Sequence, residues 1–158
     1  STLVREFCRP VTRVGGSLIA GKFDQFQKNT PYSALVAAFD DFIAQALLQS
    51  EAALAALRER IRTAVGDSGG VVARVIPAVE ELIGAQAVVP ELPAGEAAHR
   101  FNHVFQRFVQ ALATEDKPLV LFLDDLQWAD LATLRLLESL VACPELKHVL
   151  LVGAYRDN

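Results

Sequence analysis

The chain has 158 residues, of which 52% are hydrophobic and 22% charged, which is enough apolar material for one domain with a buried core and excludes a disordered tail. Its net charge of −4 argues against direct nucleic-acid binding, which needs a basic face. No apolar run approaches the roughly 20 residues of a membrane span, and Cys8 and Cys143 lack the spacing of a metal site.

The sequence contains no methionine, so we expect it to be a piece of a longer protein. Two cysteines far apart in the chain fit a reducing, cytoplasmic environment better than a disulfide framework. The length and the missing methionine lead us to interpret residues 1–158 as a fragment of one domain.

The first third of the chain predicts a helix, a strand and a second helix. Apolar residues recur at helical spacing across residues 3–14, where Pro10 is expected to end or kink the helix. The apolar segment 17–23 suits a buried strand. Pro31 suits the first turn of a long helix, whose apolar face begins at Leu35.

The middle of the chain predicts helices only. Residues 51–65 are rich in alanine and arginine, which favour helix, and 71–83 have helical periodicity with Pro77 as a kink or late start. A proline-containing loop over 84–95 precedes a strongly amphipathic helix over 98–112. We therefore expect a helical insert at about 31–114 between two strands.

The last third changes character, because a continuous apolar strand runs into two acidic residues. Residues 119–123 are all apolar and lead directly into Asp124 and Asp125, which indicates a central strand buried on both faces. A helix over 131–141 and a second apolar strand over 148–155 follow. This order predicts an α/β domain with a parallel sheet and right-handed crossovers.

Two carboxylates directly after a buried parallel strand indicate phosphoryl-transfer chemistry. The carboxyl ends of such strands face the ligand crevice. There, one Asp can hold Mg²⁺ and a neighbouring acid can orient the attacking water. Arg156, after the next strand, could reach a γ-phosphate. The alternative is a strand-end Asp that caps the following helix or turn, a role that suits Asp130.

The motifs LFLDDLQWAD and VGAYRDN resemble the Walker B and sensor-type strand ends of AAA-like P-loop ATPases of the signalling (STAND) type. The segment GGSLIAGKFDQFQKNTPYSALVAAF is similar to the region after the phosphate loop in one subgroup. In that subgroup, found in large bacterial signalling proteins, the ATPase domain lies between a Ser/Thr protein kinase domain and C-terminal GAF and histidine kinase domains. The resemblance covers essentially the whole chain.

The resemblance implies ATP and Mg²⁺ as cofactors and assigns roles by position. Asp124 would hold Mg²⁺, Asp125 would assist the attacking water, and Arg156 would sense the γ-phosphate. Ser1 corresponds to the last residue of the Walker A motif and is expected on Mg²⁺, with Thr2 beside it in the nucleotide site.

The Walker A glycines and lysine themselves are not present before Ser1. The fold that the resemblance implies is therefore a partial P-loop NTPase (AAA-like) parallel sheet flanked by helices, lacking the P-loop and its preceding strand. That strand would lie beside 148–155, so we expect an open sheet edge there, or a substitute pairing, and an inactive fragment. The stretch GSLIAGKF mimics the motif, but Phe23 cannot supply the hydroxyl for Mg²⁺, so we interpret it as a strand.

The resemblance also implies partners. The expected partners are ATP and the neighbouring kinase and sensor domains of the same parent chain. A homo-oligomer is a further option, because AAA-like relatives often assemble through their nucleotide sites. Two other interpretations stay open: a non-catalytic interaction module that docks partners through helices within 31–65, and the ATPase domain of a transcriptional regulator.

Overall fold

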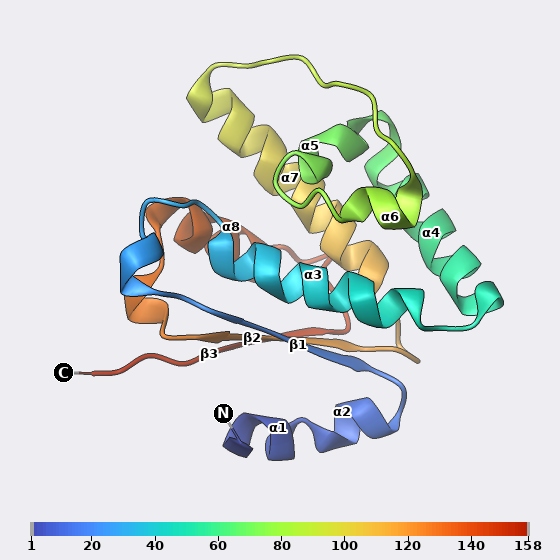
Figure 1. The fold of residues 1–158 in the computed structure, drawn as a ribbon, viewed down its shortest axis with the longest axis vertical. Helices are drawn as coiled ribbons and strands as arrows, with labels where there is room; N and C mark the ends of the chain where they lie inside the picture. The colour runs from blue at the N-terminus through green and yellow to red at the C-terminus, as the bar shows by residue number, and fades with distance from the viewer. Residues whose placement is uncertain (1, 158) are drawn as a thin grey trace.

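A three-stranded parallel sheet forms the centre of the molecule, and helices cover it (Figure 1). The computed structural model describes residues 2–157. The strands β1 (Ser17–Lys22), β2 (Leu119–Asp124) and β3 (Val149–Gly153) lie side by side in chain order. Their shared direction brings their carboxyl ends to one rim of the sheet, and the predicted α/β class with a parallel sheet is confirmed.

The central strand β2 is the most deeply buried element of the sheet. Its residues from Leu119 to Leu123 are all buried, because β1 and β3 flank it and side chains on both of its faces are covered. The register pairs Asp124 with Lys22, and Leu123 with Gly153. The last residues of the strands therefore meet at the rim that carries the acidic pair.

Eight α-helices lie among the described residues, and five of them (α3 to α7) come between β1 and β2 in the chain. Short 3₁₀ turns follow β1, α4 and β2. The helices are α1 (Thr2–Phe7), α2 (Arg9–Arg13), α3 (Ser33–Leu47), α4 (Glu51–Val65), α5 (Gly69–Ala73), α6 (Val79–Ile83), α7 (Ala94–Leu112) and α8 (Leu131–Val141), and the 3₁₀ turns are η1 (Gln25–Gln27), η2 (Gly66–Ser68) and η3 (Leu126–Trp128).

The helix expected over 71–83 is in fact two short helices, α5 and α6, with an irregular stretch between them. The first of them begins earlier than expected, at Gly69. The returning loop passes close to it, since a Cβ on Gly70 would collide with the carbonyl oxygen of Ala87. The helix breaks before Pro77, whose ring disfavours helical geometry in the residue that precedes it.

The main core lies between the sheet and the helices on one side. Aromatic rings hold it together: Phe39 of α3 packs edge-on against Phe105 of α7, with ring centroids 5.3 Å apart, and Phe108 lies on the same face of α7. Figure 1 shows α3, α7 and α8 on this side of the sheet and α1 and α2 on the other.

The opposite side of the sheet is covered more thinly. Leu3 and Phe7 of α1 are 78% and 74% exposed, although Cys8, between α1 and α2, is buried. Among the described residues β3 pairs with β2 alone, and its Leu150 is 46% exposed. The open edge that we expect beside 148–155 is therefore present.

A buried polar network joins the start of α8 to the start of α3. Asp130 caps α8, as its position in the sequence suggests: its Oδ2 accepts the N–H of Thr133 (2.9 Å) and its Oδ1 accepts the Thr133 hydroxyl. The Thr133 oxygen, fully buried, accepts the N–H of Tyr32 (3.2 Å). One carboxylate thus fixes two helices below the rim of the sheet.

We predict that Gly21→Ala destabilises the fold. A Cβ at this position in β1 would collide with the backbone carbonyl of Ala34 in α3, which cannot rotate away as a side chain would. Overpacking of this kind costs about 1–3 kcal/mol of unfolding free energy, measurable by urea denaturation. Gly95→Ala is the matched control, because a Cβ there meets no atom within 4 Å, and it should stabilise α7 by about 0.5 kcal/mol. Equal effects of the two changes would contradict this packing.

We predict that Asp130→Ala costs more stability than loss of an ordinary cap. The variant removes the cap of α8 and also leaves the buried Thr133 hydroxyl without its acceptor, so the unfolding free energy should fall by about 2 kcal/mol. Ser50→Ala removes only an exposed cap of α4 and should cost about 1 kcal/mol. Denaturation midpoints that rank the two variants in the reverse order would argue against the network.

We predict that Asp130→Asn lowers the pKa of Tyr32. Burial first, and then the negative charge of Asp130, raise this pKa above its ordinary value of 10.0. The folded phenol therefore keeps its proton where the unfolded one ionises, so the fold loses stability as the pH rises above about 10. Asn keeps the cap but removes the charge. The pKa of Tyr32 should therefore fall toward its ordinary value, and the loss of stability at high pH should become smaller. The chain has two tyrosines, so an ultraviolet titration of tyrosinate in a Tyr155→Phe background reports Tyr32 alone. An unchanged Tyr32 titration would contradict the assignment.

Candidate functional site

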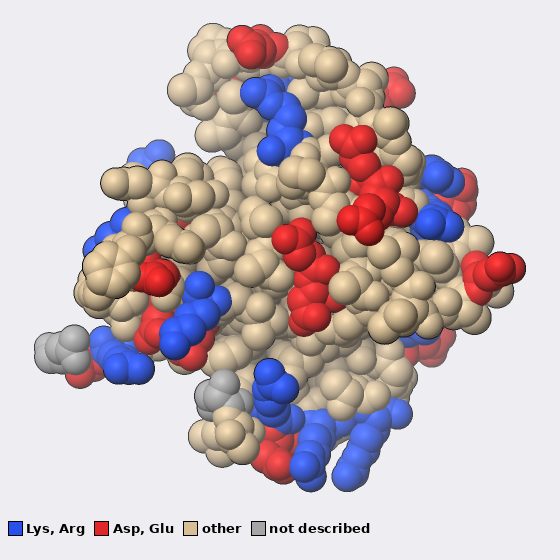
Figure 2. Space-filling view, in the orientation of Figure 1, with Lys and Arg blue, Asp and Glu red and all other residues tan. Residues whose placement is uncertain are grey.

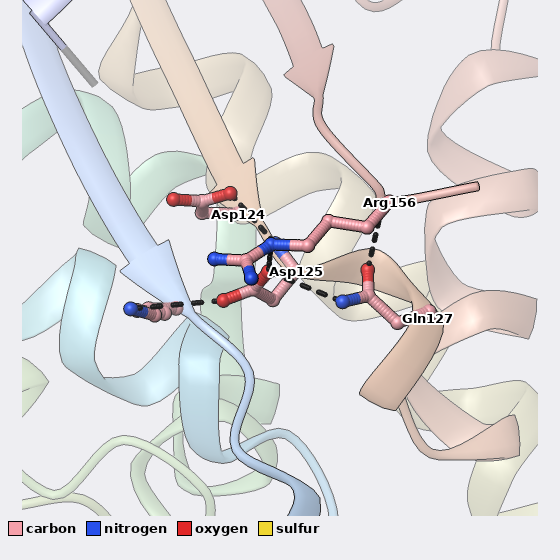
Figure 3. A network of polar contacts seen from close by, with 5 residues as sticks. Asp124, Asp125, Gln127 and Arg156 are labelled. Carbon is pink, nitrogen blue, oxygen red and sulfur yellow. Dashed lines mark hydrogen bonds and ion pairs between the residues drawn. The ribbon is translucent and has the colours of Figure 1, made fainter. Parts of the chain in front are cut away.

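Charged and polar side chains from all three strands meet at the carboxyl-terminal rim of the sheet (Figure 3). Asp124 and Asp125 stand at the end of β2, Lys22 is the last residue of β1, and Arg156 follows β3. The topology alone produces this meeting, since parallel strands deliver their carboxyl ends to the same side.

Asp125 occupies the left-handed region of the backbone, with φ 56° and ψ 45°. Few residues other than glycine adopt this geometry, and aspartate tolerates it better than most. The sharp turn is held on both sides: the N–H of Asp125 donates to Oδ1 of Asp124 (2.8 Å), and the N–H of Leu126 donates to the carbonyl of Ala154 (2.9 Å). The turn reverses the chain at the rim and directs the Asp125 carboxylate back across it.

The Asp125 carboxylate is 10% exposed and lies between two cations. Its Oδ2 is 3.6 Å from Nζ of Lys22, and its Oδ1 is 3.5 Å from Nε of Arg156. A carboxylate withdrawn from water needs such partners to remain charged. The two cations themselves are mostly exposed, so both can be reached from solvent.

Gln127 joins this cluster through both ends of its amide (Figure 3). Its Nε2 donates to Oδ1 of Asp125 (3.1 Å), and its Oε1 accepts the backbone N–H of Arg156 (3.2 Å). Sequence reasoning missed Gln127, although it lies within LFLDDLQWAD. It placed Lys22 at the end of a strand, where lining the site was one option, but did not count it among the site residues. The register between β1 and β2 is the signal that could have found Lys22.

The two carboxylates of the pair face different hollows. Asp125 lines one of about 690 Å³, together with Lys22, Gln127, Trp128 and Arg156. Asp124 lines one of about 520 Å³, which Val4 and Arg5 of α1 border on the other side. Lys22 lines both hollows, so the two carboxylates share one cationic neighbour.

Trp128 closes one wall of the Asp125 hollow. Its ring packs against the main core, and Nζ of Lys28 lies 4.8 Å from the ring centroid, a cation–π contact from the loop after β1. The tryptophan thus tethers the β1 loop to the β2 turn. Figure 2 shows blue and red side chains interspersed where the chain's end emerges, which matches the mixed charge of this rim.

The structure brings three of the predicted site residues together: Asp124, Asp125 and Arg156. Thr2 is the exposed first residue of α1. Ser1, predicted as a Mg²⁺ ligand, lies outside the described residues. The chemical roles that the resemblance assigns to these residues stay predictions.

The residues at the rim fit Mg²⁺ of the kind bound with a nucleotide. Such Mg²⁺ takes one or two carboxylates and completes its shell with phosphate oxygens and water. Asp124 supplies a partly exposed carboxylate whose Oδ1 is anchored by a backbone N–H. Within residues 2–157 no three His, Cys, Asp or Glu side chains cluster as a metal cage, so a metal here would depend on ligands from elsewhere, such as a phosphate.

Comparison with known proteins identifies the family. No solved structure matches this chain significantly. Hybrid signal transduction histidine kinase G of Dictyostelium discoideum is 36% identical over 142 residues, which are 89% of this chain but 4% of the relative. Among the described residues no helix is both long and apolar enough to cross a membrane. The model of the AAA ATPase domain family matches residues 1–152. The chain therefore belongs to the AAA ATPase domain family, and its parallel sheet flanked by helices is that of a partial P-loop NTPase.

Proposed function

We propose that this domain binds and hydrolyses Mg-ATP as a regulatory module of a multidomain signal-transduction kinase. The observation that carries the proposal is the meeting of Asp124, Asp125 and Arg156 at one rim of the sheet, in a chain of the AAA ATPase domain family. The Dictyostelium discoideum relative supports the signalling context, since its name is that of a hybrid signal transduction histidine kinase.

Asp124 is the residue that would hold the metal. It ends the most buried strand, so its backbone is rigid, and the bond from the Asp125 N–H fixes one of its oxygens. Its side chain lines the hollow that α1 borders, which is the side on which the Walker A residues would stand. Mg²⁺, when bound there, would neutralise charge on the phosphate oxygens.

Asp125 would position the attacking water, and Arg156 would bind the γ-phosphate. In the described structure the Arg156 guanidinium lies against Asp125. A phosphate competes for the same guanidinium, because Arg binds phosphate as well as carboxylate. Movement of Arg156 onto a phosphate would leave Oδ1 of Asp125 with Gln127 as its remaining partner and open room for a water there. Binding of the nucleotide would thus make the Asp125 carboxylate available to the attacking water.

Ser1 and Thr2 would complete the nucleotide site from the start of α1. The resemblance implies that the glycines and lysine of the phosphate loop stand immediately before Ser1 in the parent gene, with the strand that pairs with the open edge of β3 before them. The genomic sequence upstream of Ser1 tests this directly. An upstream segment without Gly-x-x-x-x-Gly-Lys would overturn ATP hydrolysis as the function.

The parent protein is proposed to belong to the signalling (STAND) subtype. Its partners would be the kinase and sensor domains of the same chain, and hydrolysis or exchange of ATP would alter the contacts between them. A homo-oligomer assembled through the nucleotide sites is a further proposal. This chain spans 4% of the length of the relative it matches, and the kinase and sensor partners are part of the proposal.

A nucleotide switch without turnover is the second candidate. The observation that favours it is the pairing of Asp125 with Lys22, Arg156 and Gln127, which leaves its carboxylate engaged in the described structure. If these partners hold Asp125 when ATP is bound as well, the domain would bind ATP and change its contacts without hydrolysis.

We predict that Asp124→Asn in the full-length parent protein removes Mg²⁺-dependent ATP binding or turnover. Loss of the charge that holds the metal should lower kcat/KM by about a hundredfold or more, measured by phosphate release over a Mg²⁺ series. Asp116→Asn is the matched control, because it removes an exposed carboxylate that precedes β2 at the opposite end of the strand.

The outcomes separate the candidates. Hydrolysis by the wild type that Asp125→Asn lowers about a hundredfold, to a residual rate that can still be measured, with ATP binding retained, supports the ATPase. Tight binding without turnover in the wild type supports the switch. Asp124→Asn kinetics equal to those of Asp116→Asn would retire Asp124 as the metal ligand.

A further inference from the structure

We infer that Gln127 is a positioning residue that couples the orientation of the Asp125 carboxylate to the position of the Arg156 strand end. The inference rests on the proposed ATPase and names an element that adjusts it. Gln127 belongs to the 3₁₀ turn η3, directly after the acidic pair, and neither the family match nor the relative assigns it a role.

The geometry makes a closed ring of contacts. Nε2 of Gln127 donates to Oδ1 of Asp125 (3.1 Å), and Oε1 of the same amide accepts the N–H of Arg156 (3.2 Å). Nε of Arg156 returns to Oδ1 of Asp125 (3.5 Å). The side chain of Arg156 can leave this ring for a phosphate, whereas its backbone N–H remains held by Gln127.

An amide closes the ring because it carries a donor and an acceptor on one side chain. The Gln127 amide donates to a carboxylate at one end and accepts from a backbone N–H at the other. Glutamate would keep the acceptor for Arg156 but place a negative charge against Asp125. Methionine keeps the length and much of the packing but supplies neither bond.

The surroundings of Gln127 are rigid enough for this bond to matter. The N–H of Leu126 donates to the carbonyl of Ala154 (2.9 Å), and the N–H of Ala154 donates to the carbonyl of Leu123 (2.9 Å), so the β2 turn and the end of β3 are already joined at the backbone. A Cβ on Gly153 would collide with the Leu126 side chain, which shows how closely they pass. A small shift of the β3 end therefore reaches Asp125 through Gln127.

The test measures Mg-ATP hydrolysis by the full-length parent protein with Gln127→Met and Gln127→Glu. We expect Gln127→Met to lower kcat about tenfold with KM changed less than about twofold, because the variant loses a bond to a charged group but no contact with ATP. Gln127→Glu should lower kcat further through repulsion of Asp125. Gln110→Met is the matched control, since Gln110 lies in the last turn of α7, which precedes the start of β2, and donates to the carbonyl of Glu145 on the surface.

A double-mutant cycle with Asp125→Asn separates positioning from general loss of structure. If Gln127 acts through Asp125, Gln127→Met has no further effect on kcat in the Asp125→Asn background. Additive losses, or a Gln127→Met protein that behaves like Gln110→Met, would overturn the inference and leave the proposed ATPase standing. A wild type that does not hydrolyse ATP would overturn the proposed hydrolysis, and the inference with it.

Discussion

The arrangement of side chains at the carboxyl-terminal rim of the sheet depends on one buried carboxylate, that of Asp125, and on its contacts with residues at the ends of the two other strands. The Asp125 carboxylate is withdrawn from water and lies between Lys22, the last residue of β1, and Arg156, which follows β3. These residues are far apart in the sequence and meet only because three parallel strands end together. The left-handed backbone at Asp125 is the local condition for this meeting, since it directs the carboxylate back across the rim.

The rest of the fold keeps that rim in place. The aromatic contacts between α3 and α7 and the Asp130–Thr133–Tyr32 network anchor α3 and α8 below the strands. The opposite side of the sheet is less complete, with an open β3 edge and an exposed α1. The molecule therefore combines a firmly packed acidic rim with a side that offers backbone and apolar surface to further elements.

Sequence patterns predicted the strands well, because short apolar runs bounded by polar or charged residues are typical of buried strands. The predicted strands 17–23, 119–123 and 148–155 are observed at Ser17–Lys22, Leu119–Asp124 and Val149–Gly153, and Asp130 caps α8 as expected. For 71–83 the sequence predicted a kink or a late start at Pro77, but not two separate short helices, α5 and α6. Periodicity shows which residues face the core. It does not show where a helix ends, which here depends on Pro77 and on packing against distant segments such as the loop at Ala87.

The sequence by itself determined the class of the sheet and the presence of Asp124, Asp125 and Arg156 at strand ends, because hydrophobic runs and their polar boundaries are local properties of the chain. Tertiary structure alone decided which of these side chains meet. The pairing of Lys22 with Asp125 and the two bonds of Gln127 depend on strand register and on one left-handed residue, and both are settled only when distant segments pack together.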